Sequence, residues 1–311
     1  MTVRLSSNRL DWLDATRGMA LVAMTIYHFT WDLEFFGYVQ PGTVTSGGWV
    51  IFARSIAASF LLIVGVSLSI AAARGLNTKS YLKRTAIVAT AALVITTATL
   101  FATPNSFIFF GILHHIALAS LLGLVLIRTR TAFLFVVIIA IGGLQFGFAG
   151  NAVFDPKWLA WTGLYDNTPR SNDFVPLVPW FAFVVVGLIL GRYILKGAQI
   201  ENRVTSSDAL KPIRFIGRHS LAYYLLHQPV LIAFIASVWY FFPPAPQSGG
   251  STTMMQSCQQ TCGETHGGEF CEAYCECGVG FVLNNPNPDL DELQTVCEAE
   301  AITRIDGDEI Q

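Results

Sequence analysis

The chain has 311 residues, of which 53% are hydrophobic and only 13% are charged. Soluble domains carry roughly 25% charged residues, so this composition excludes an ordinary soluble domain and favours an integral membrane protein. The net charge of −2 hides a basic region, residues 1–242 with 18 of the 19 Lys and Arg residues, and an acidic remainder that holds all six cysteines.

Seven apolar runs are long enough to cross a bilayer, because a spanning helix needs about 20 mostly apolar residues. The predicted spans cover residues 12–36, 49–73, 83–103, 107–127, 131–150, 175–195 and 214–241. The first run has no small-residue cleavage site, so we expect a retained span and not a signal peptide. The sequence therefore predicts an all-α integral membrane protein with about seven transmembrane helices and a small Cys-rich extracytoplasmic tail.

Basic residues gather in alternate loops of this predicted topology. They are Arg4 and Arg9, then Arg74, Lys79, Lys83 and Arg84, then Arg128 and Arg130, and last Arg192, Lys196, Arg203, Lys211 and Arg214. The intervening loops hold only Lys157 and Arg170. Basic loops stay on the cytoplasmic side, so we expect a cytoplasmic N-terminus and a C-terminal tail on the opposite side.

The first predicted span carries four ionisable residues on one narrow stripe, namely Asp14, Arg17, His28 and Asp32. With a rise of about 1.5 Å per residue, Arg17 and His28 lie about 16 Å apart along one helix face. Ionisable groups inside a span are costly and commonly functional. His28 is the candidate general base, and Asp32 would orient its imidazole. The alternative is structural, with Asp14 paired to Arg17 and His28 paired to Asp32.

The spacing from Arg17 to His28, R-X10-H, resembles the signature of the transmembrane acyltransferase family 3. Residues 8–242 also resemble bacterial relatives of the heparan-alpha-glucosaminide N-acetyltransferase catalytic domain. The segments that carry this resemblance are Arg9-Leu10-Asp11 with Asp14 and Arg17-Gly18, Phe110-Gly111-Ile112-Leu113-His114-His115, Asp173-Phe174-Val175-Pro176-Leu177-Val178-Pro179-Trp180, and Gly217-Arg218-His219-Ser220-Leu221 with Tyr224-Leu225-Leu226-His227-Gln228-Pro229. The eukaryotic enzyme keeps its catalytic histidine in the loop after the first span. Here residues 33–47 contain no histidine, which makes His28 the better candidate.

The resemblance implies a membrane-bound acyltransferase in the inner membrane of a bacterium. It would move an acyl group, expected to be acetyl, from cytoplasmic acyl-CoA to a hydroxyl or amine of a sugar-like or glycan acceptor at the outer side. Acetyl-CoA would be the donor substrate, and neither a metal nor a nucleic acid is expected. Arg17, Arg218 and Asp14 form the candidate donor site, and His114 or His115 would donate to the developing oxyanion.

Each of these assignments has an alternative. The rival function is a proton-coupled small-molecule transporter, whose His and Asp chain would relay protons. His114 and His115 point about 100° apart, so we expect only one to face a cavity, and both are alternatively interhelical hydrogen-bonding groups. Arg218 is either a phosphate contact or an anchor at the cytoplasmic face. His227 precedes Gln228-Pro229, which predicts a kink.

The six cysteines of the tail are Cys258, Cys262, Cys271, Cys275, Cys277 and Cys297. The first four form two Cys-x3-Cys turns, and cysteines at i and i+4 share a helix face. Folded antiparallel, these turns would pair the first cysteine with the fourth and the second with the third, which leaves the last two for a third disulfide. The alternative is a metal site made by Cys275, Cys277 and His266. An extracytoplasmic location favours disulfides.

Three regions are therefore predicted. Residues 1–242 form a transmembrane acyltransferase domain, and residues 243–253, with three prolines and a Ser-Gly-Gly-Ser run, form a linker. Residues 254–311 form the acidic cysteine-rich tail. The tail is not part of the resemblance, so we expect it to be dispensable for acyl transfer.

Overall fold

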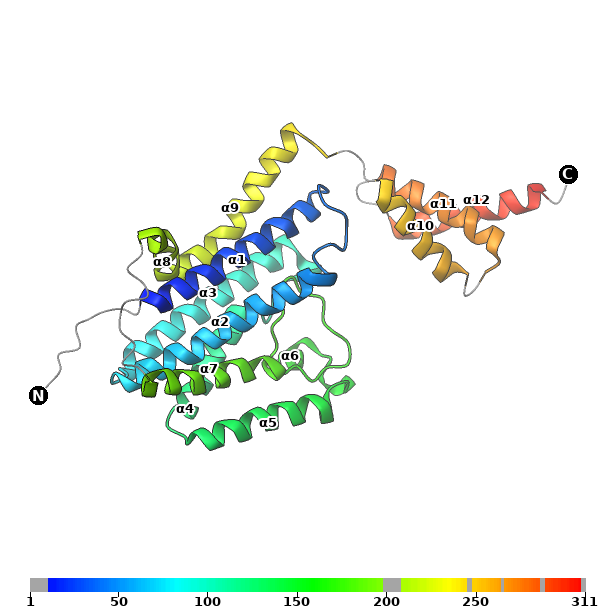
Figure 1. Cartoon of the computed structure of the whole chain (residues 1–311). Coiled ribbons are helices and arrows are strands. Elements are labelled where there is room, and N and C mark those ends of the chain that lie inside the picture. The colour runs from blue at the N-terminus through cyan, green and yellow to red at the C-terminus, as the bar shows by residue number, and fades with distance from the viewer. Residues whose placement is uncertain (1–10, 198–207, 245–247, 264–265, 286–288, 309–311) are drawn as a thin grey trace, which may run out of the picture. The chain divides into compact units, whose positions relative to one another are not determined.

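A computed structural model describes residues 11–197, 208–244, 248–263, 266–285 and 289–308. Over these residues the chain is helical and contains no strand, which confirms the predicted all-α class. Arg4, Arg9 and Arg203 of the predicted basic loops lie outside the described residues. The helices, shown in Figure 1, are α1 (Asp11–Phe35), α2 (Gly47–Ala73), α3 (Thr78–Ala102), α4 (Ile112–Leu126), α5 (Thr131–Phe148), α6 (Lys157–Ala160), α7 (Leu177–Gly197), α8 (Lys211–Arg218), α9 (Ser220–Phe241), α10 (Ser248–Cys262), α11 (Gly268–Asn284) and α12 (Leu290–Asp308).

Five helices, α2, α3, α5, α7 and α9, are long and apolar enough to cross a membrane. Their outward faces carry large apolar side chains, such as Ile139 and Phe146 of α5, which are 73% and 93% exposed. Such exposure is unfavourable in water and favourable in lipid, so the chain is an integral membrane protein. The count of seven spans stays a prediction. α1 carries charged residues, and α4 has 15 residues, about 22 Å at 1.5 Å per residue.

Two predicted span boundaries are wrong. The fourth span was expected from residue 107, but α4 begins at Ile112, because Pro104–Ser106 form a 3-10 turn and Gly111 has an extended backbone. The last span was expected as one helix over 214–241, but α8 and α9 are separate helices. His219, with φ −105° and ψ 30°, ends α8. The chain turns there because α8 packs on α1, where Gly217 lies against the backbone of Asp14.

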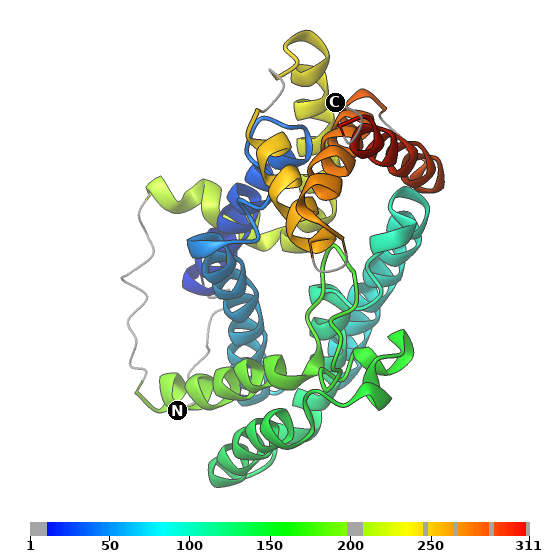
Figure 2. The same ribbon diagram turned by 90° about the vertical axis from the view of Figure 1, so that its right-hand side faces the viewer.

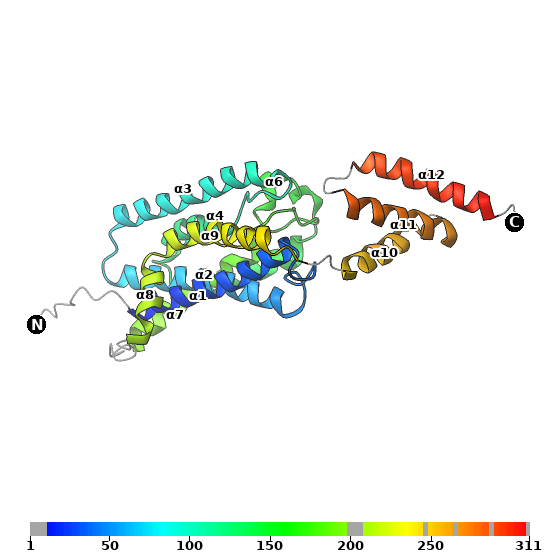
Figure 3. The same cartoon turned by 90° about the horizontal axis from the view of Figure 1, so that it is seen from above.

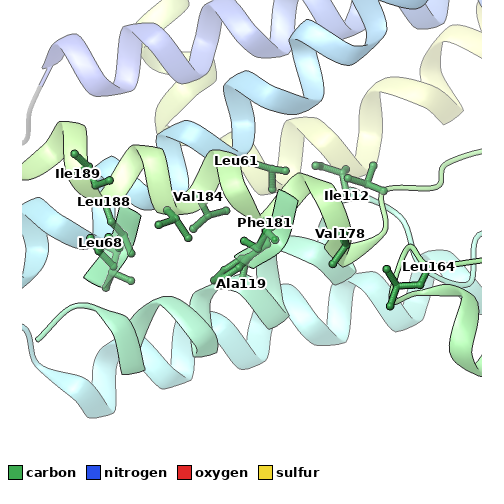
Figure 4. Close-up of a cluster of buried hydrophobic side chains, with 14 residues drawn as sticks. Leu61, Leu68, Ile112, Ala119, Leu164, Val178, Phe181, Val184, Leu188 and Ile189 are labelled. Carbon is green, nitrogen blue, oxygen red and sulfur yellow. The ribbon is translucent and has the colours of Figure 1, made fainter. Parts of the chain in front are cut away.

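The contacts within the chain divide it into two units, residues 1–29 with 45–233 and residues 30–44 with 234–311. In the first unit, α2 packs along α7, while α4 and α5 cover the same core. Leu61 and Leu68 of α2 meet Val184 and Leu188 of α7 there, with Ala119 of α4 beside them (Figure 4). All five of these side chains are almost fully buried, so α2, α4 and α7 share one apolar core.

The second unit contains the tail, where α11 lies between α10 and α12 (Figures 2 and 3). Disulfides Cys258–Cys275 and Cys262–Cys271 join α10 to α11, and Cys277–Cys297 joins α11 to α12. The predicted pairing is therefore confirmed. Both cysteines of the alternative metal site are held in disulfides, so neither is available as a thiolate ligand. The predicted linker overlaps α10, which begins at Ser248, and residues 245–247 lie outside the description. The domain boundaries stay predictions.

Candidate active site

Four arginines line a pocket of about 640 Å³ formed by the ends of several helices in the first unit. They are Arg17 of α1, Arg74 after α2, Arg84 of α3 and Arg218 of α8. We call this feature the arginine pocket. Guanidinium groups bind phosphate through paired, charge-assisted hydrogen bonds. Four of them around one cavity therefore favour a ligand with several negative charges.

Asp14 holds two of these arginines in place. Its Oδ1 lies 3.3 Å from Nη1 of Arg17, and its Oδ2 lies 3.3 Å from Nε of Arg218. Arg17 also donates from Nη2 to Oγ of Ser67, at 2.5 Å. Arg218 has a second carboxylate partner, because its Nη2 lies 3.0 Å from Oδ1 of Asp11. The predicted Asp14–Arg17 pair is present, and Asp14 also joins α1 to the end of α8.

Two glycines allow α1 and α8 to cross in close contact beside these arginines. A Cβ added at Gly18 would lie 2.0 Å from the carbonyl oxygen of Ile213, and one at Gly217 would lie 1.8 Å from the carbonyl oxygen of Asp14. Neither position has room for a side chain. The sequence pairs Arg17-Gly18 and Gly217-Arg218 thus have one physical explanation. In each pair the glycine brings the two backbones together, and the adjacent arginine enters the pocket.

Two histidines meet further along α1. The rings of His28 and His227 have centroids 5.0 Å apart in an edge-on arrangement, and we call them the histidine pair. Nδ1 of His227 lies 2.6 Å from the carbonyl oxygen of Tyr224. A carbonyl only accepts, so Nδ1 carries the proton, and in the neutral ring Nε2 carries the lone pair. That Nε2 is buried and has no hydrogen-bond partner among the described residues.

Asp173, in the segment between α6 and α7, joins α4 to α9. Its Oδ2 accepts hydrogen bonds from the backbone N–H of Ile112, at 2.9 Å, and from the hydroxyl of Tyr224, at 3.4 Å. Desolvation raises the pKa of the Asp173 carboxyl above its ordinary value, because packed protein surrounds it, while both hydrogen bonds act in the opposite direction. Tyr224 also supplies the carbonyl that fixes His227. Asp173 is thus two contacts away from the histidine pair.

The remaining predicted site histidines are bonded to protein atoms. Nδ1 of His114 accepts from the N–H of Gly111, at 3.2 Å, and its Nε2 lies 3.1 Å from Oγ1 of Thr96. Nδ1 of His115 lies 3.0 Å from the carbonyl oxygen of Val175, so Nδ1 carries that proton. An oxyanion donor needs an N–H, and these bonds already use the one that each neutral ring has. The oxyanion role of both residues stays a prediction.

Asp32 lies one turn after His28 on the continuous helix α1 and is fully buried. It belongs to the second unit and His28 to the first, so its role as the group that orients His28 stays a prediction. The helix itself confirms that the four ionisable residues of the first span lie on one helical segment.

A family model described as "Heparan-alpha-glucosaminide N-acetyltransferase, catalytic" matches residues 9–229. The chain belongs to this family. The match contains the arginine pocket and the histidine pair, and it ends before the tail. No curated protein and no solved structure matches the chain significantly. The R-X10-H resemblance to acyltransferase family 3 stays a prediction. A heparan-alpha-glucosaminide N-acetyltransferase-like catalytic domain in a membrane-spanning helical protein indicates a membrane acetyltransferase.

The sequence does not single out every residue of this candidate site. In the sequence, Arg74 and Arg84 read as basic loop residues that set the topology, and His227 reads as part of a kinked helix, a kind of helix that often lines a cavity. Asp173 and Tyr224 belong to segments that carry the family resemblance, and the sequence alone assigns neither of them a role in the site. A signal for the two arginines is present in the sequence, because basic residues at the predicted cytoplasmic ends of several spans are expected at one depth. The pairing of His227 with His28 depends on tertiary packing.

Proposed function

We propose that the chain is an acetyl-CoA-dependent acetyltransferase that passes the acetyl group to a hydroxyl or amine of a sugar-like acceptor. The observation that carries this proposal is the presence of two different sites on one helix. Arg17 of the arginine pocket and His28 of the histidine pair both belong to α1, about 16 Å apart at 1.5 Å per residue. One element thus serves an anion site and a proton-accepting site.

The chemistry of the arginine pocket fits the phosphate end of a coenzyme A thioester. Arg17 and Arg218 would hold phosphate oxygens, with Arg74 and Arg84 completing the positive lining. The separation of about 16 Å along α1 is on the scale of the extended pantetheine arm. When bound, acetyl-CoA supplies an acetyl group activated as a thioester. The chain's own contribution is to hold the anionic end away from the reacting end.

The histidine pair would carry the proton chemistry. His28 takes the proton of the acceptor hydroxyl or amine as that group attacks the thioester carbonyl carbon. The carbon–sulfur bond then breaks, and the sulfur leaves as a thiol after it receives a proton. Asp32, one turn away on α1, would orient His28. The sugar-like acceptor follows from the family description, whose named substrate is a glucosaminide.

The proposed direction of transfer is from the cytoplasm outward. It rests on the positive-inside rule, since Arg74 and Arg84 belong to a predicted cytoplasmic loop. Reporters fused at residue 245 and within the 196–211 loop should appear on opposite sides of the inner membrane. Reporters on the same side would contradict the seven-span topology and this direction.

The test of the function uses detergent-purified full-length protein and acetyl-CoA labelled in the acetyl group. We expect saturable binding of coenzyme A, release of free thiol that depends on an amino sugar or a sugar alcohol, and transfer of the label to that acceptor. The His28→Ala variant is the control for background acetylation. Transport of the sugar into proteoliposomes without any acetyl transfer would support the carrier function and refute the enzyme.

A further inference from the structure

We infer that His227 is a second catalytic base, which handles the acceptor's proton together with His28. This inference rests on the proposed acetyl transfer and deepens it. The R-X10-H spacing points only to Arg17 and His28, and the family match over residues 9–229 assigns no role to His227. The observations that carry it are the forced tautomer of His227, its unpaired Nε2 and the ring of His28 beside it.

The tautomer of His227 follows from its contact with Tyr224. Because Nδ1 donates to the Tyr224 carbonyl over 2.6 Å, the neutral ring presents Nε2 as a proton acceptor. Besides His28 and Tyr224, the ring of His227 contacts that of Tyr223, stacked at a centroid distance of 6.3 Å. Tyr223 is itself fixed by a hydrogen bond of 2.8 Å between its hydroxyl and that of Thr25 on α1. The ring of His227 is therefore held in one orientation.

A role in packing alone does not explain this arrangement. A buried nitrogen without a hydrogen bond is unfavourable, and a phenylalanine would fill the same space without that cost. His114, by contrast, has both of its nitrogens bonded to protein atoms. His115 also leaves Nε2 unpaired, but its ring contact is with Phe110, an apolar side chain. Only His227 presents its lone pair next to a second histidine in the described part of the chain.

The pair performs one proton cycle. The acceptor's O–H or N–H bond breaks as its oxygen or nitrogen bonds to the thioester carbonyl carbon, and the proton moves to Nε2 of His227 or to the neighbouring His28. The carbon–sulfur bond breaks with its electron pair on sulfur. The histidine pair then returns the proton to that sulfur, so free coenzyme A leaves as a thiol and both rings are neutral again.

The experiment compares His227→Asn, His227→Phe and His28→Ala, alone and with His28→Ala combined with His227→Asn. The asparagine side chain still donates to the Tyr224 carbonyl but has no basic nitrogen. We expect His227→Asn and His227→Phe to lower kcat by about 10²–10⁴-fold, with unchanged coenzyme A affinity. When two residues act as one unit, the losses in kcat caused by substituting each of them do not add up. The double variant should therefore be no slower than the slower single variant. His266→Ala, on an exposed tail residue, is the matched control and should keep full activity.

Two results would overturn the inference while leaving the proposed function intact. One is full turnover by a folded His227→Asn or His227→Phe protein that still depends on His28. The other is a double variant whose loss is the product of the two single losses, which would mean independent roles. A wild-type protein that transfers no acetyl group at all refutes the function itself.

A further readout is independent of activity. ¹⁵N NMR of histidine-labelled protein should show an unprotonated Nε2 that disappears in His227→Asn, and a protonated Nε2 would contradict the inference.

Discussion

The arginine pocket and the histidine pair lie on the same helix but satisfy their polar groups in opposite ways. In the pocket, Asp14 contacts both Arg17 and Arg218, and Asp11 adds a second contact to Arg218. In the pair, Nε2 of His227 is buried without a hydrogen-bond partner among the residues described. In the proposed function, the first site holds the anionic donor and the second accepts a proton.

The difference has a simple physical basis. A buried charge without a counter-charge is strongly unfavourable, and Arg17, whose side chain is only 16% exposed, has Asp14 as its counter-charge. A neutral imidazole nitrogen is tolerated at lower cost. A site that binds an anion can therefore be complete before its ligand arrives, whereas a site for proton transfer must keep one lone pair available.

The largest effect is expected for His28→Ala. Loss of the general base should lower kcat by about 10²–10⁴-fold, while coenzyme A affinity stays close to wild type, because the arginine pocket is about 16 Å away along α1. Single-turnover kinetics with labelled acetyl-CoA and calorimetric titration with coenzyme A measure the two quantities. Transfer at the normal rate by a well-folded His28→Ala protein would show that the base is wrongly assigned, and His114 or His115 would be examined next.

Arg17→Ala tests the arginine pocket, the other of the two sites compared. Loss of a charged hydrogen bond to phosphate should weaken coenzyme A binding by about 1.5–3 kcal/mol. Arg17→Lys should restore only part of it, because lysine lacks the planar fork. If Arg17→Ala and His28→Ala both lowered thermal stability together, with no separation of binding from turnover, the stripe on α1 would be structural and the proposed division of roles would fail.

Gly217→Ala tests the close crossing of α1 and α8. The added methyl group would lie 1.8 Å from the Asp14 carbonyl oxygen, so the helices must separate, at a cost of about 1–3 kcal/mol in stability. Because the separation moves Arg218 relative to Asp14, coenzyme A binding should weaken as well. Gly143→Ala is the matched control. It lies on α5 with open space around its Cβ position, and it should leave binding unchanged. If Gly217→Ala and Gly143→Ala had equal effects, the close crossing of α1 and α8 would not explain why a glycine adjoins an arginine in Arg17-Gly18 and Gly217-Arg218.

Asp173→Ala should cost about 1–3 kcal/mol, because the N–H of Ile112 and the Tyr224 hydroxyl lose their shared acceptor. Asp173→Asn keeps an acceptor oxygen and should cost less. The raised pKa of Asp173 also has a defined sign. Folding favours the protonated form, so this residue's contribution to stability falls as the pH rises from the ordinary carboxyl range to the raised pKa. Thermal unfolding in detergent at several pH values should show that fall in wild type and not in Asp173→Asn.

The parts of this structure that follow from periodic spacing could be predicted from the sequence. The parts that depend on tertiary packing could not. Hydrophobic length predicted the five described helices that are long and apolar enough to cross a membrane, and the i,i+4 spacing of cysteines, which fixes a helix face, predicted the disulfides. The Asp14–Arg17 pair also followed from local spacing. The break at His219 did not, since residues 214–241 read as one apolar run, and the turn is set by the contact of Gly217 with α1. The His28–His227 contact joins residues about 200 positions apart, and no local spacing encodes it.

The smallest effect on turnover is expected from removing the tail after residue 247. Its three helices are joined to one another by three disulfides, and Arg304 pairs with Glu276 within it, at 2.8 Å. The family match ends at residue 229, and every member of the arginine pocket and the histidine pair lies before that residue. A truncated protein that inserts correctly should therefore keep the wild-type kcat and coenzyme A affinity. Non-reducing mass spectrometry of the full chain should find no free thiol, and six free thiols would refute the oxidised tail. Loss of acetyl transfer on truncation, with insertion intact, would instead mean that the tail contributes to catalysis.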